Sequence, residues 1–148
     1  MLKPLRTDAQ APWKQRFRIP TFLSSQVART HATRGVICSN APGIFQLSAW
    51  DITSGTLWQR SHEPHGVLVG MIAPDGSYIY YPVDPDGDMC GHIVRVPFEG
   101  GTVQDITPDF PPYPCYQICL SAAGTLLVFP VPTREEQGTD LYVVPLGL

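Results

Sequence analysis

The densest group of potential metal ligands is His62-Glu63-Pro64-His65, in which two imidazoles lie three residues apart with a carboxylate between them. Imidazole and carboxylate are both ligands that zinc accepts. Helical zinc motifs, however, place two histidines four residues apart on one face of a helix, and Pro64 opposes a helix here. We therefore predict a solvated loop, with metal binding as the alternative.

Three carboxylates alternate along a second segment, at Asp84, Asp86 and Asp88. Oxygen ligands gathered on one loop attract a hard cation such as calcium. A calcium loop of the helix-loop-helix type needs glycine at its sixth position and an acid at its twelfth, where this sequence has Met89 and Arg95. The segment is predicted to be a polar hairpin loop, and calcium binding is the alternative.

The four cysteines, Cys38, Cys90, Cys115 and Cys119, are too few and too scattered to form a disulfide scaffold in a chain of this size. Cys115 and Cys119 are four residues apart, so on a strand they would share one face. Redox and zinc motifs use two intervening residues, and this pair has three. We predict reduced cysteines that serve mainly as small hydrophobic core residues.

Charged side chains cluster at two further places. Lys14, Arg16 and Arg18 alternate with uncharged residues, so on an extended segment they would share one solvated face. Glu135-Glu136 could contact a substrate amine, but we predict a solvated loop there. The formal net charge of −3 gives no reason to expect a nucleic-acid partner.

The overall composition favours short strands joined by tight turns. The 148 residues include 16 Pro and 13 Gly, 43% are hydrophobic and only 16% are charged. This balance suits an all-β domain with a real core and opposes a helical bundle or a disordered chain. No apolar run approaches a membrane span and the first residues lack the apolar core of a secretory signal, so we expect a soluble, cytoplasmic protein.

An internal repeat determines how these strands are arranged. An alternating strand followed by a glycine turn and a threonine spans residues 44–56 and returns at residues 91–102, with an offset of 46 residues. The strand at residues 92–98 returns at residues 140–146, with an offset of 48. A repeat period of about 40–50 residues is typical of propellers and solenoids.

A second landmark, a glycine turn before an aliphatic or aromatic strand, repeats along with the first. Gly76 ends the turn at residues 73–76, and Gly124 holds the same place 48 residues later. Gly35 is matched to Gly76 from 41 residues upstream. Proline at the second turn position and glycine at a position of positive φ both suit such a turn.

Each repeat unit is predicted to contain four antiparallel strands, which is the composition of one β-propeller blade. In the middle unit the strands cover about residues 67–73, 77–83, 92–97 and 102–106. The predicted fold class is therefore all-β, a partial β-propeller of about three four-stranded antiparallel blades.

The blades are predicted at approximately residues 17–62, 66–108 and 114–148, all within one domain of residues 1–148, and the last is incomplete. Closed propellers have about four to eight blades. We therefore expect the chain to be a fragment of a longer polypeptide.

Five motifs extend over most of the chain. They are residues 13–18 (WKQRFR), 46–51 (QLSAWD), 74–76 (PDG), 91–101 (GHIVRVPFEGG) and 105–109 (DITPD). Together they resemble the N-terminal β-propeller of prolyl oligopeptidase-family serine peptidases, close to the acylaminoacyl-peptidase-like bacterial members. The sequence departs from the family pattern at Ala73, where serine is more usual, and in the third unit, which lacks the proline and aspartate of the turn.

This resemblance implies a domain that gates the access of peptides to an α/β-hydrolase domain of the parent polypeptide. Such a hydrolase carries its serine nucleophile in a G-x-S-x-G turn. That pentapeptide does not occur here, since Ser77 follows Gly76 but precedes Tyr78 and Ile79. We therefore expect the hydrolase domain to be absent from this chain, and no residue of the chain to be catalytic or to bind a metal or cofactor.

The leading hypothesis is a non-catalytic, substrate-gating propeller segment whose partners are a C-terminal hydrolase domain and, through the parent, a peptide substrate. The alternative is a TolB-like or WD-like propeller that serves as a binding scaffold without a hydrolase. Trp50-Asp51 resembles the dipeptide that ends a strand in WD propellers, and a structural role explains it. Uncovered blade faces and edge strands also predict self-association of the chain, without a membrane or nucleic-acid partner.

Overall fold

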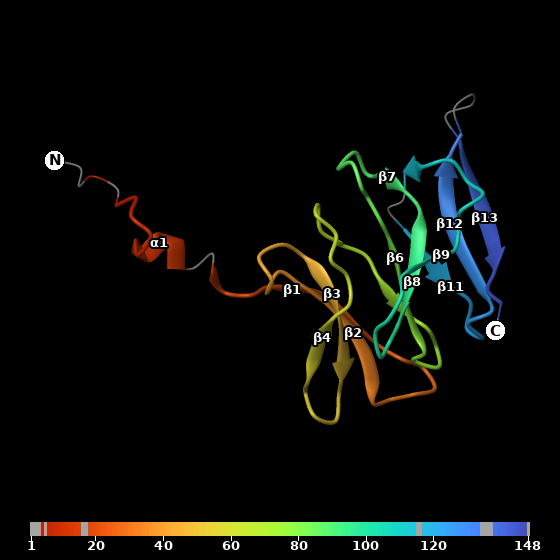
Figure 1. The fold of residues 1–148 in the computed structure, drawn as a ribbon, viewed down its shortest axis with the longest axis horizontal. Helices are drawn as coiled ribbons and strands as arrows, with labels where there is room; N and C mark the ends of the chain where they lie inside the picture. The colour runs from red at the N-terminus through yellow and green to blue at the C-terminus, as the bar shows by residue number, and fades with distance from the viewer. Residues whose placement is uncertain (1–3, 5, 16–17, 115–116, 134–137, 148) are drawn as a thin grey trace.

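The computed structural model describes residues 4, 6–15, 18–114, 117–133 and 138–147 (Figure 1). Its N-terminal segment leads away from the sheets and contains one short helix, α1 (Pro12–Gln15). Proline suits the first helical position, where its missing N–H leaves no bond unmade. Lys14 lies on this helix and not on an extended segment, so the prediction of a shared strand face is wrong for it, and Arg16 lies outside the described residues. No helix within the described ranges is long and apolar enough to cross a bilayer.

The first sheet is a four-stranded antiparallel meander. Its strands pair in chain order and are β1 (Phe22–Val27), β2 (Arg34–Ser39), β3 (Gln46–Asp51) and β4 (Leu57–Gln59). The turn between β3 and β4 uses Gly55, whose φ of 75° is a backbone conformation that glycine adopts without steric cost.

The middle sheet repeats this arrangement. Its strands are β5 (Met71–Ile72), β6 (Tyr78–Pro82), β8 (Ile93–Pro97) and β9 (Gln104–Asp105), again antiparallel and in chain order. All four lie inside the predicted ranges, but the two edge strands are only two residues long. A separate two-stranded ladder joins β7 (Cys90–Gly91) in the loop after β6 to β10 (Tyr113–Pro114).

The third sheet has three strands, β11 (Cys119–Leu120), β12 (Leu126–Pro132) and β13 (Thr139–Pro145). It lies at the C-terminal end of the molecule in Figure 1, with β13 at its edge. Two four-stranded sheets followed by a three-stranded one confirm the predicted all-β fold class.

Two sets of equivalent hydrogen bonds fix the structural repeat. The first closes the turn between the first two strands of each sheet, and its donor and acceptor pairs are Ala28 N and Arg34 O, Ala73 N and Tyr78 O, and Ser121 N and Leu126 O. The second joins the end of the third strand to that turn, and its pairs are Ile52 N and Thr33 O, Phe98 N and Ser77 O, and Leu146 N and Thr125 O. The positions Ile52, Phe98 and Leu146 therefore recur at the predicted offsets of 46 and 48 residues.

The turn of the first unit differs from the prediction. The equivalent bonds make Arg34 of the first unit correspond to Tyr78 of the middle unit, so the offset between these units is 44 residues here. The predicted match of Gly35 to Gly76, at an offset of 41, is therefore wrong. The first-unit turn is one residue longer than the other two.

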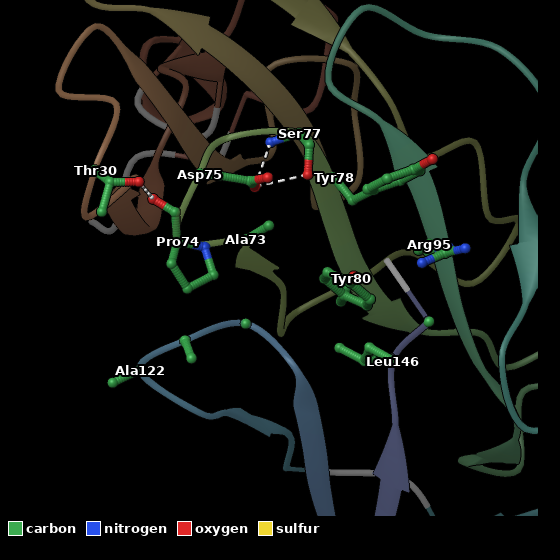
Figure 2. Close-up of a pocket in the computed structure, with 13 residues that line it drawn as sticks. Thr30, Ala73, Pro74, Asp75, Ser77, Tyr78, Tyr80, Arg95, Ala122 and Leu146 are labelled. Atoms are coloured by element: carbon green, nitrogen blue, oxygen red, sulfur yellow. Dashed lines mark hydrogen bonds between the residues drawn. The ribbon is translucent and has the colours of Figure 1, made fainter.

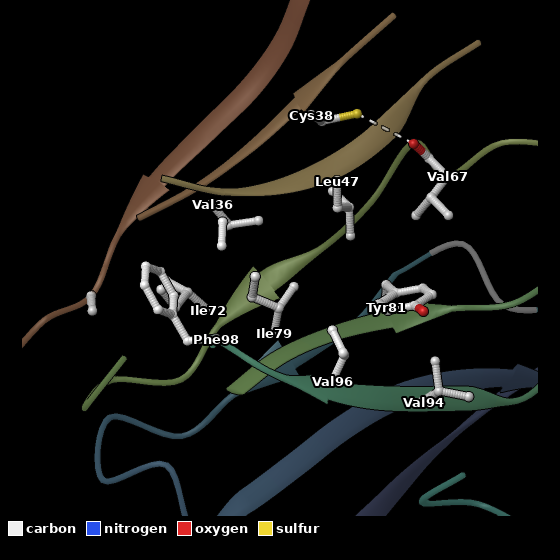
Figure 3. Packing of buried hydrophobic residues seen from close by; sticks show 12 residues of the cluster. Val36, Cys38, Leu47, Val67, Ile72, Ile79, Tyr81, Val94, Val96 and Phe98 are labelled. Carbon is white, nitrogen blue, oxygen red and sulfur yellow. Dashed lines mark hydrogen bonds between the residues drawn. The ribbon is translucent and has the colours of Figure 1, made fainter. Parts of the chain in front are cut away.

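The middle sheet is covered on both faces. Side chains alternate along a strand, so Ile79 and Tyr81 of β6 pack against the first sheet while Tyr80 packs against the third. The core between the first and middle sheets is shown in Figure 3, where Val36 and Leu47 approach β6 from the first sheet. This alternation explains why the sequence of β6 is apolar or aromatic at consecutive positions.

The core between the middle and third sheets is aromatic. Phe129 of β12 stacks on Tyr113 with ring centroids 5.0 Å apart and on Tyr142 at 5.9 Å. Phe110 meets the Phe129 ring edge-on, also at 5.9 Å. Such ring pairs stabilise a core beyond the area that they bury, and they hold the third sheet against the middle one.

Candidate functional site

A cavity of about 580 Å³ opens between the turns of the middle and third sheets (Figure 2). Its lining residues come from segments far apart in the sequence and are Thr30, Ala73, Pro74, Asp75, Ser77, Tyr78, Tyr80, Arg95, Ala122, Ala123, Gly124, Leu146 and Gly147. The volume lies within the range of small-ligand sites in proteins.

The middle sheet supplies the aromatic wall of this cavity. Tyr78 and Tyr80 lie two residues apart on β6, so both side chains point from the same face. Arg95 of β8 pairs with Tyr80 across the ladder, and its guanidinium carbon lies 4.5 Å from the centre of the Tyr78 ring. The Arg95 Nε donates a hydrogen bond of 2.9 Å to Gln104 Oε1. The cation is therefore held in place by a stacked ring and a neutral hydrogen-bond partner.

Burial affects the ionisation of this wall. Tyr80 is only 3% exposed, and its desolvation raises the pKa of the phenol, while a hydrogen bond with Arg95 acts in the opposite direction. The phenol stays neutral at ordinary pH, so Arg95 is the group that gives this wall its charge.

The turn between β5 and β6 forms the opposite rim. Asp75 Oδ1 accepts hydrogen bonds from the Ser77 backbone N–H at 3.0 Å and from the Ser77 hydroxyl at 2.6 Å. These two bonds lower the pKa of Asp75, with a smaller contribution from the charge of Arg34. Thr30 donates both its N–H and its hydroxyl to the Pro74 carbonyl oxygen, which ties this rim to the first sheet.

The third sheet brings its own turn close to this rim. A Cβ atom built on Gly124 would lie 3.0 Å from Pro74 Cδ, and the φ of Gly124 is +72°. Both observations require glycine, because a side chain would push the two turns apart. Apart from Leu146, the third sheet lines the cavity with the small residues Ala122, Ala123, Gly124 and Gly147.

The chemistry of this lining is that of recognition. A guanidinium, two phenols and a carboxylate bind polar groups of a ligand, whereas the described lining contains no histidine or cysteine. The Ser77 hydroxyl donates to Asp75 and has no imidazole beside it to take its proton. Nucleophilic catalysis needs such a base.

A histidine and a carboxylate do pair elsewhere. His92 Nδ1 lies 2.6 Å from Asp105 Oδ2, and Tyr113 stacks on the imidazole. The buried His92 Nε2 has no hydrogen-bond partner among the described residues. Because no hydroxyl or thiol is bonded to it, this pair does not form a catalytic triad in the part of the chain that the structure describes.

The predicted histidine segment lies in a loop. His62 and His65 follow β4, and His62 Nδ1 lies 3.1 Å from Gln59 Nε2. Burial raises the pKa of the Glu63 carboxyl, and the nearby His62 opposes this shift. Within the described ranges, no three His, Cys, Asp or Glu side chains lie close enough to hold a metal ion together.

The three alternating aspartates stabilise their own loop. Asp84 accepts hydrogen bonds from the backbone N–H groups of Gly87 and Met89, and Asp88 accepts one from Cys90. These bonds explain the alternating carboxylates as turn residues. The structure places them in a polar loop, as predicted.

The cysteines differ from one another. Cys38 is buried in the first core and donates to the Val67 carbonyl oxygen, so the core prediction is confirmed for it. Cys90 is half-buried. Cys119 is exposed, so the prediction that it packs in the core is wrong. Cys119 pairs with Val128 on the face of the third sheet that no described element covers. Cys115 and Glu135-Glu136 lie outside the described residues.

Trp50-Asp51 has a structural role, as predicted. The Asp51 carboxylate accepts hydrogen bonds from the backbone N–H groups of Thr53 and Ser54, which shapes the turn after β3.

Arg95 is a site residue that the sequence did not predict. Its signal is a cation inside the otherwise apolar strand Ile93–Pro97, at a position that would be expected to pack.

Neither a protein-family model nor a curated protein sequence matches the chain. Solved structures do match it. TolB from Acinetobacter baumannii has a TM-score of 0.60 at 18% identity, over 82% of this chain and 29% of that chain. A putative TolB from Agrobacterium tumefaciens has a TM-score of 0.62 at 21% identity, over 78% of this chain and 42% of that chain.

The chain is a partial β-propeller. The tricorn protease also matches, with a TM-score of 0.62 at 16% identity, over 85% of this chain and 14% of that one. The propeller segment spans less than half the length of each of these structures. At such low identity the likeness shows the fold, in which each of the three sheets is a blade.

Proposed function

We propose that this propeller segment is a non-catalytic binding scaffold that holds a carboxylate-bearing peptide between its middle and third blades. The observation that carries the proposal is Arg95, whose guanidinium stands at the cavity wall against the Tyr78 ring. Arginine recognises carboxylates through paired hydrogen bonds, and a guanidinium fixed beforehand loses little entropy on binding.

The remaining lining supports a peptide as the ligand. Tyr78 offers aromatic surface together with a hydroxyl group, and the Asp75 carboxylate suits a peptide N–H or a cationic side chain. Pockets of this kind use a few polar groups to orient a ligand that apolar and aromatic surface otherwise holds.

The test is affinity selection from a pool of short random peptides, with the retained peptides identified by mass spectrometry. We expect the wild-type chain to retain peptides enriched in carboxylates. Arg95→Gln should weaken their binding about tenfold or more, because a hydrogen bond to a charged group contributes ~1.5–3 kcal/mol.

Arg6→Ala is the matched control, since Arg6 lies in the N-terminal segment and pairs with Asp8. Its peptide affinities should equal those of the wild type. Retention of no peptide by the wild type, or equal affinities for Arg95→Gln and the wild type, would rule the proposal out. Thermal melting of each variant shows whether its fold is retained.

A second candidate function is gating of peptide entry to the hydrolase domain of a prolyl oligopeptidase-type serine peptidase. The likeness to the tricorn protease over 85% of this chain favours it. In that case the complete polypeptide that contains this segment would carry further blades and a G-x-S-x-G strand-turn-helix, and it would cleave chromogenic peptides. The 148-residue chain by itself should not. A complete polypeptide without a hydrolase domain would exclude this candidate.

A further inference from the structure

The first and middle blades enclose a cleft that is equivalent to the candidate cavity between the middle and third blades. This first cleft has a volume of about 200 Å³. The hydrogen bonds that fix the repeat match positions of its lining to positions that line the candidate cavity. The matched pairs are Arg34 and Tyr78, Phe98 and Leu146, and Glu99 and Gly147.

A local contact recurs at the rim of both clefts. Thr33 Oγ1 lies 3.0 Å from His31 Nδ1 in the first cleft. In the candidate cavity the Ser77 hydroxyl donates to Asp75 Oδ1 at 2.6 Å. Counted back from the matched residues of the second strands, the two pairs hold the same positions. The two clefts are therefore one structural feature, formed twice.

A carboxylate of the chain itself binds the cation of the first cleft. Glu99 Oε1 lies 2.5 Å from Arg34 Nη2, and the Arg34 guanidinium carbon lies 4.5 Å from the centre of the Phe98 ring. The same guanidinium donates a hydrogen bond of 3.2 Å to the Gly76 carbonyl oxygen. A guanidinium stacked on a ring and paired with a carboxylate is an arrangement that arginine favours.

The candidate cavity repeats the stacked cation but lacks the carboxylate. Arg95 lies against the Tyr78 ring as Arg34 lies against Phe98, whereas glycine stands at position 147 in place of Glu99. Among the described residues, no carboxylate forms an ion pair with Arg95. The volumes of about 580 Å³ and about 200 Å³ agree with this difference, since a side chain is missing from the larger cleft.

We infer that Gly147 keeps the candidate cavity open, and that the carboxylate of the ligand takes the place that the Glu99 carboxylate holds in the first cleft. This inference rests on the proposed function and assigns where the ligand's acid lies, between Gly147 and Arg95. A Cβ atom built on Gly147 has no atom within 4 Å, and the φ of Gly147 lies outside the left-handed region. The space beside Gly147 therefore accepts either a ligand or a side chain.

Substitutions of Gly147 test this assignment. Gly147→Glu should supply the missing carboxylate and compete with the ligand for Arg95, and Gly147→Gln is the matched control of the same size without the charge. Against the acidic peptides that the wild-type chain retains, Gly147→Glu should weaken binding about tenfold or more. Gly147→Gln should weaken it much less.

A thermodynamic cycle tests the same contact without a peptide. In the presence of Arg95, Gly147→Glu should lower the equilibrium constant for unfolding about twofold or more relative to Gly147→Gln. The difference should vanish when both are combined with Arg95→Gln. Urea unfolding measures all four variants, and equal constants in the presence of Arg95 would show that an acid at position 147 does not reach it, which contradicts the inference.

The source of the ligand's carboxylate is distinguished with modified peptides. Amidation of the C-terminus removes a terminal carboxylate, and replacement of Asp and Glu by Asn and Gln removes those of side chains. Loss of binding in either series supports the assignment, and unchanged binding in both overturns it.

Failure of the inference and failure of the proposed function have different signatures. If the wild type retains no peptide, the proposed function fails and the inference fails with it. If Arg95→Gln loses affinity while Gly147→Glu binds as well as Gly147→Gln, the proposed function stands and the place assigned to the ligand's carboxylate is wrong.

Discussion

Tyr81 shows what burial does to a single ionisable side chain in this fold. It lies on β6, is 1% exposed and belongs to the core between the first and middle blades. Desolvation raises the pKa of its phenol to about 12, with a smaller contribution from the charge of Glu63. The core therefore stabilises the neutral phenol relative to the phenolate.

This shift predicts a loss of stability in alkaline solution. The folded-state pKa lies above the ordinary value near 10, so the contribution of Tyr81 is complete below pH 10 and is lost as the pH rises towards 12. Between pH 9 and pH 12 the free energy of unfolding should fall in both proteins. The fall should be about 1–3 kcal/mol smaller in Tyr81→Phe than in the wild type. Urea unfolding at each pH measures this difference. Equal losses in the two proteins would show that the Tyr81 phenol is not the responsible group.

The extent to which single residues could be predicted depends on where their partners lie. The Asp84 carboxylate bonds backbone groups within five residues, so its sequence context predicts a loop correctly. Cys119 is exposed because no described blade covers its face of the third sheet, and no local pattern carries that information. Arg95 belongs to a site only because Tyr78 and the turn of the third sheet lie beside it.

At the scale of elements, the third strand of each blade was the most predictable part. Its alternation of side chains and the glycine turn after it give the offsets of 46 and 48 residues that the hydrogen bonds confirm. The predicted match of Gly35 to Gly76 is wrong because the turn of the first blade holds one extra residue. Edge strands such as β5 and β9 are shorter than predicted, since their length depends on ladder pairing as well as on residue type.

The turns of the blades offer a matched pair of glycine substitutions. Gly55 and Gly124 have φ values of +75° and +72°, so alanine at either position costs about 1–2 kcal/mol of backbone strain. No atom lies within 4 Å of a Cβ built on Gly55, whereas one built on Gly124 lies 3.0 Å from Pro74 Cδ. Gly124→Ala should therefore lower the free energy of unfolding more than Gly55→Ala does.

Urea unfolding of the two alanine variants measures this comparison. The additional loss in Gly124→Ala reports the close approach of the two turns that border the candidate cavity. Equal losses would mean that the turns separate without cost, and that the rim formed by Pro74 and Gly124 does not hold the middle and third blades together.

At the scale of the whole molecule, the candidate site was beyond the reach of the sequence. Its lining joins Thr30, Asp75, Arg95 and Gly124, which belong to three different blades. Each of these residues has an ordinary local role as a turn or strand residue. The blades themselves were predictable because every unit repeats the same pattern, but a repeated pattern does not reveal which faces are covered.

Hydrogen exchange measures which faces are covered in solution. The middle blade is packed on both faces, so the amides of β6 and β8 should exchange slowest in every form of the chain. The first and third blades are each packed against another described blade on one face alone, so the interior strands β2 and β12 should exchange faster than β6 and β8. Leu141→Asp changes a residue of β13 that is 71% exposed, so it should leave the exchange of β6 and β8 unchanged. If mass spectrometry instead shows β2 and β12 as strongly protected as β6 and β8, the outer faces of the first and third blades are covered in solution as well.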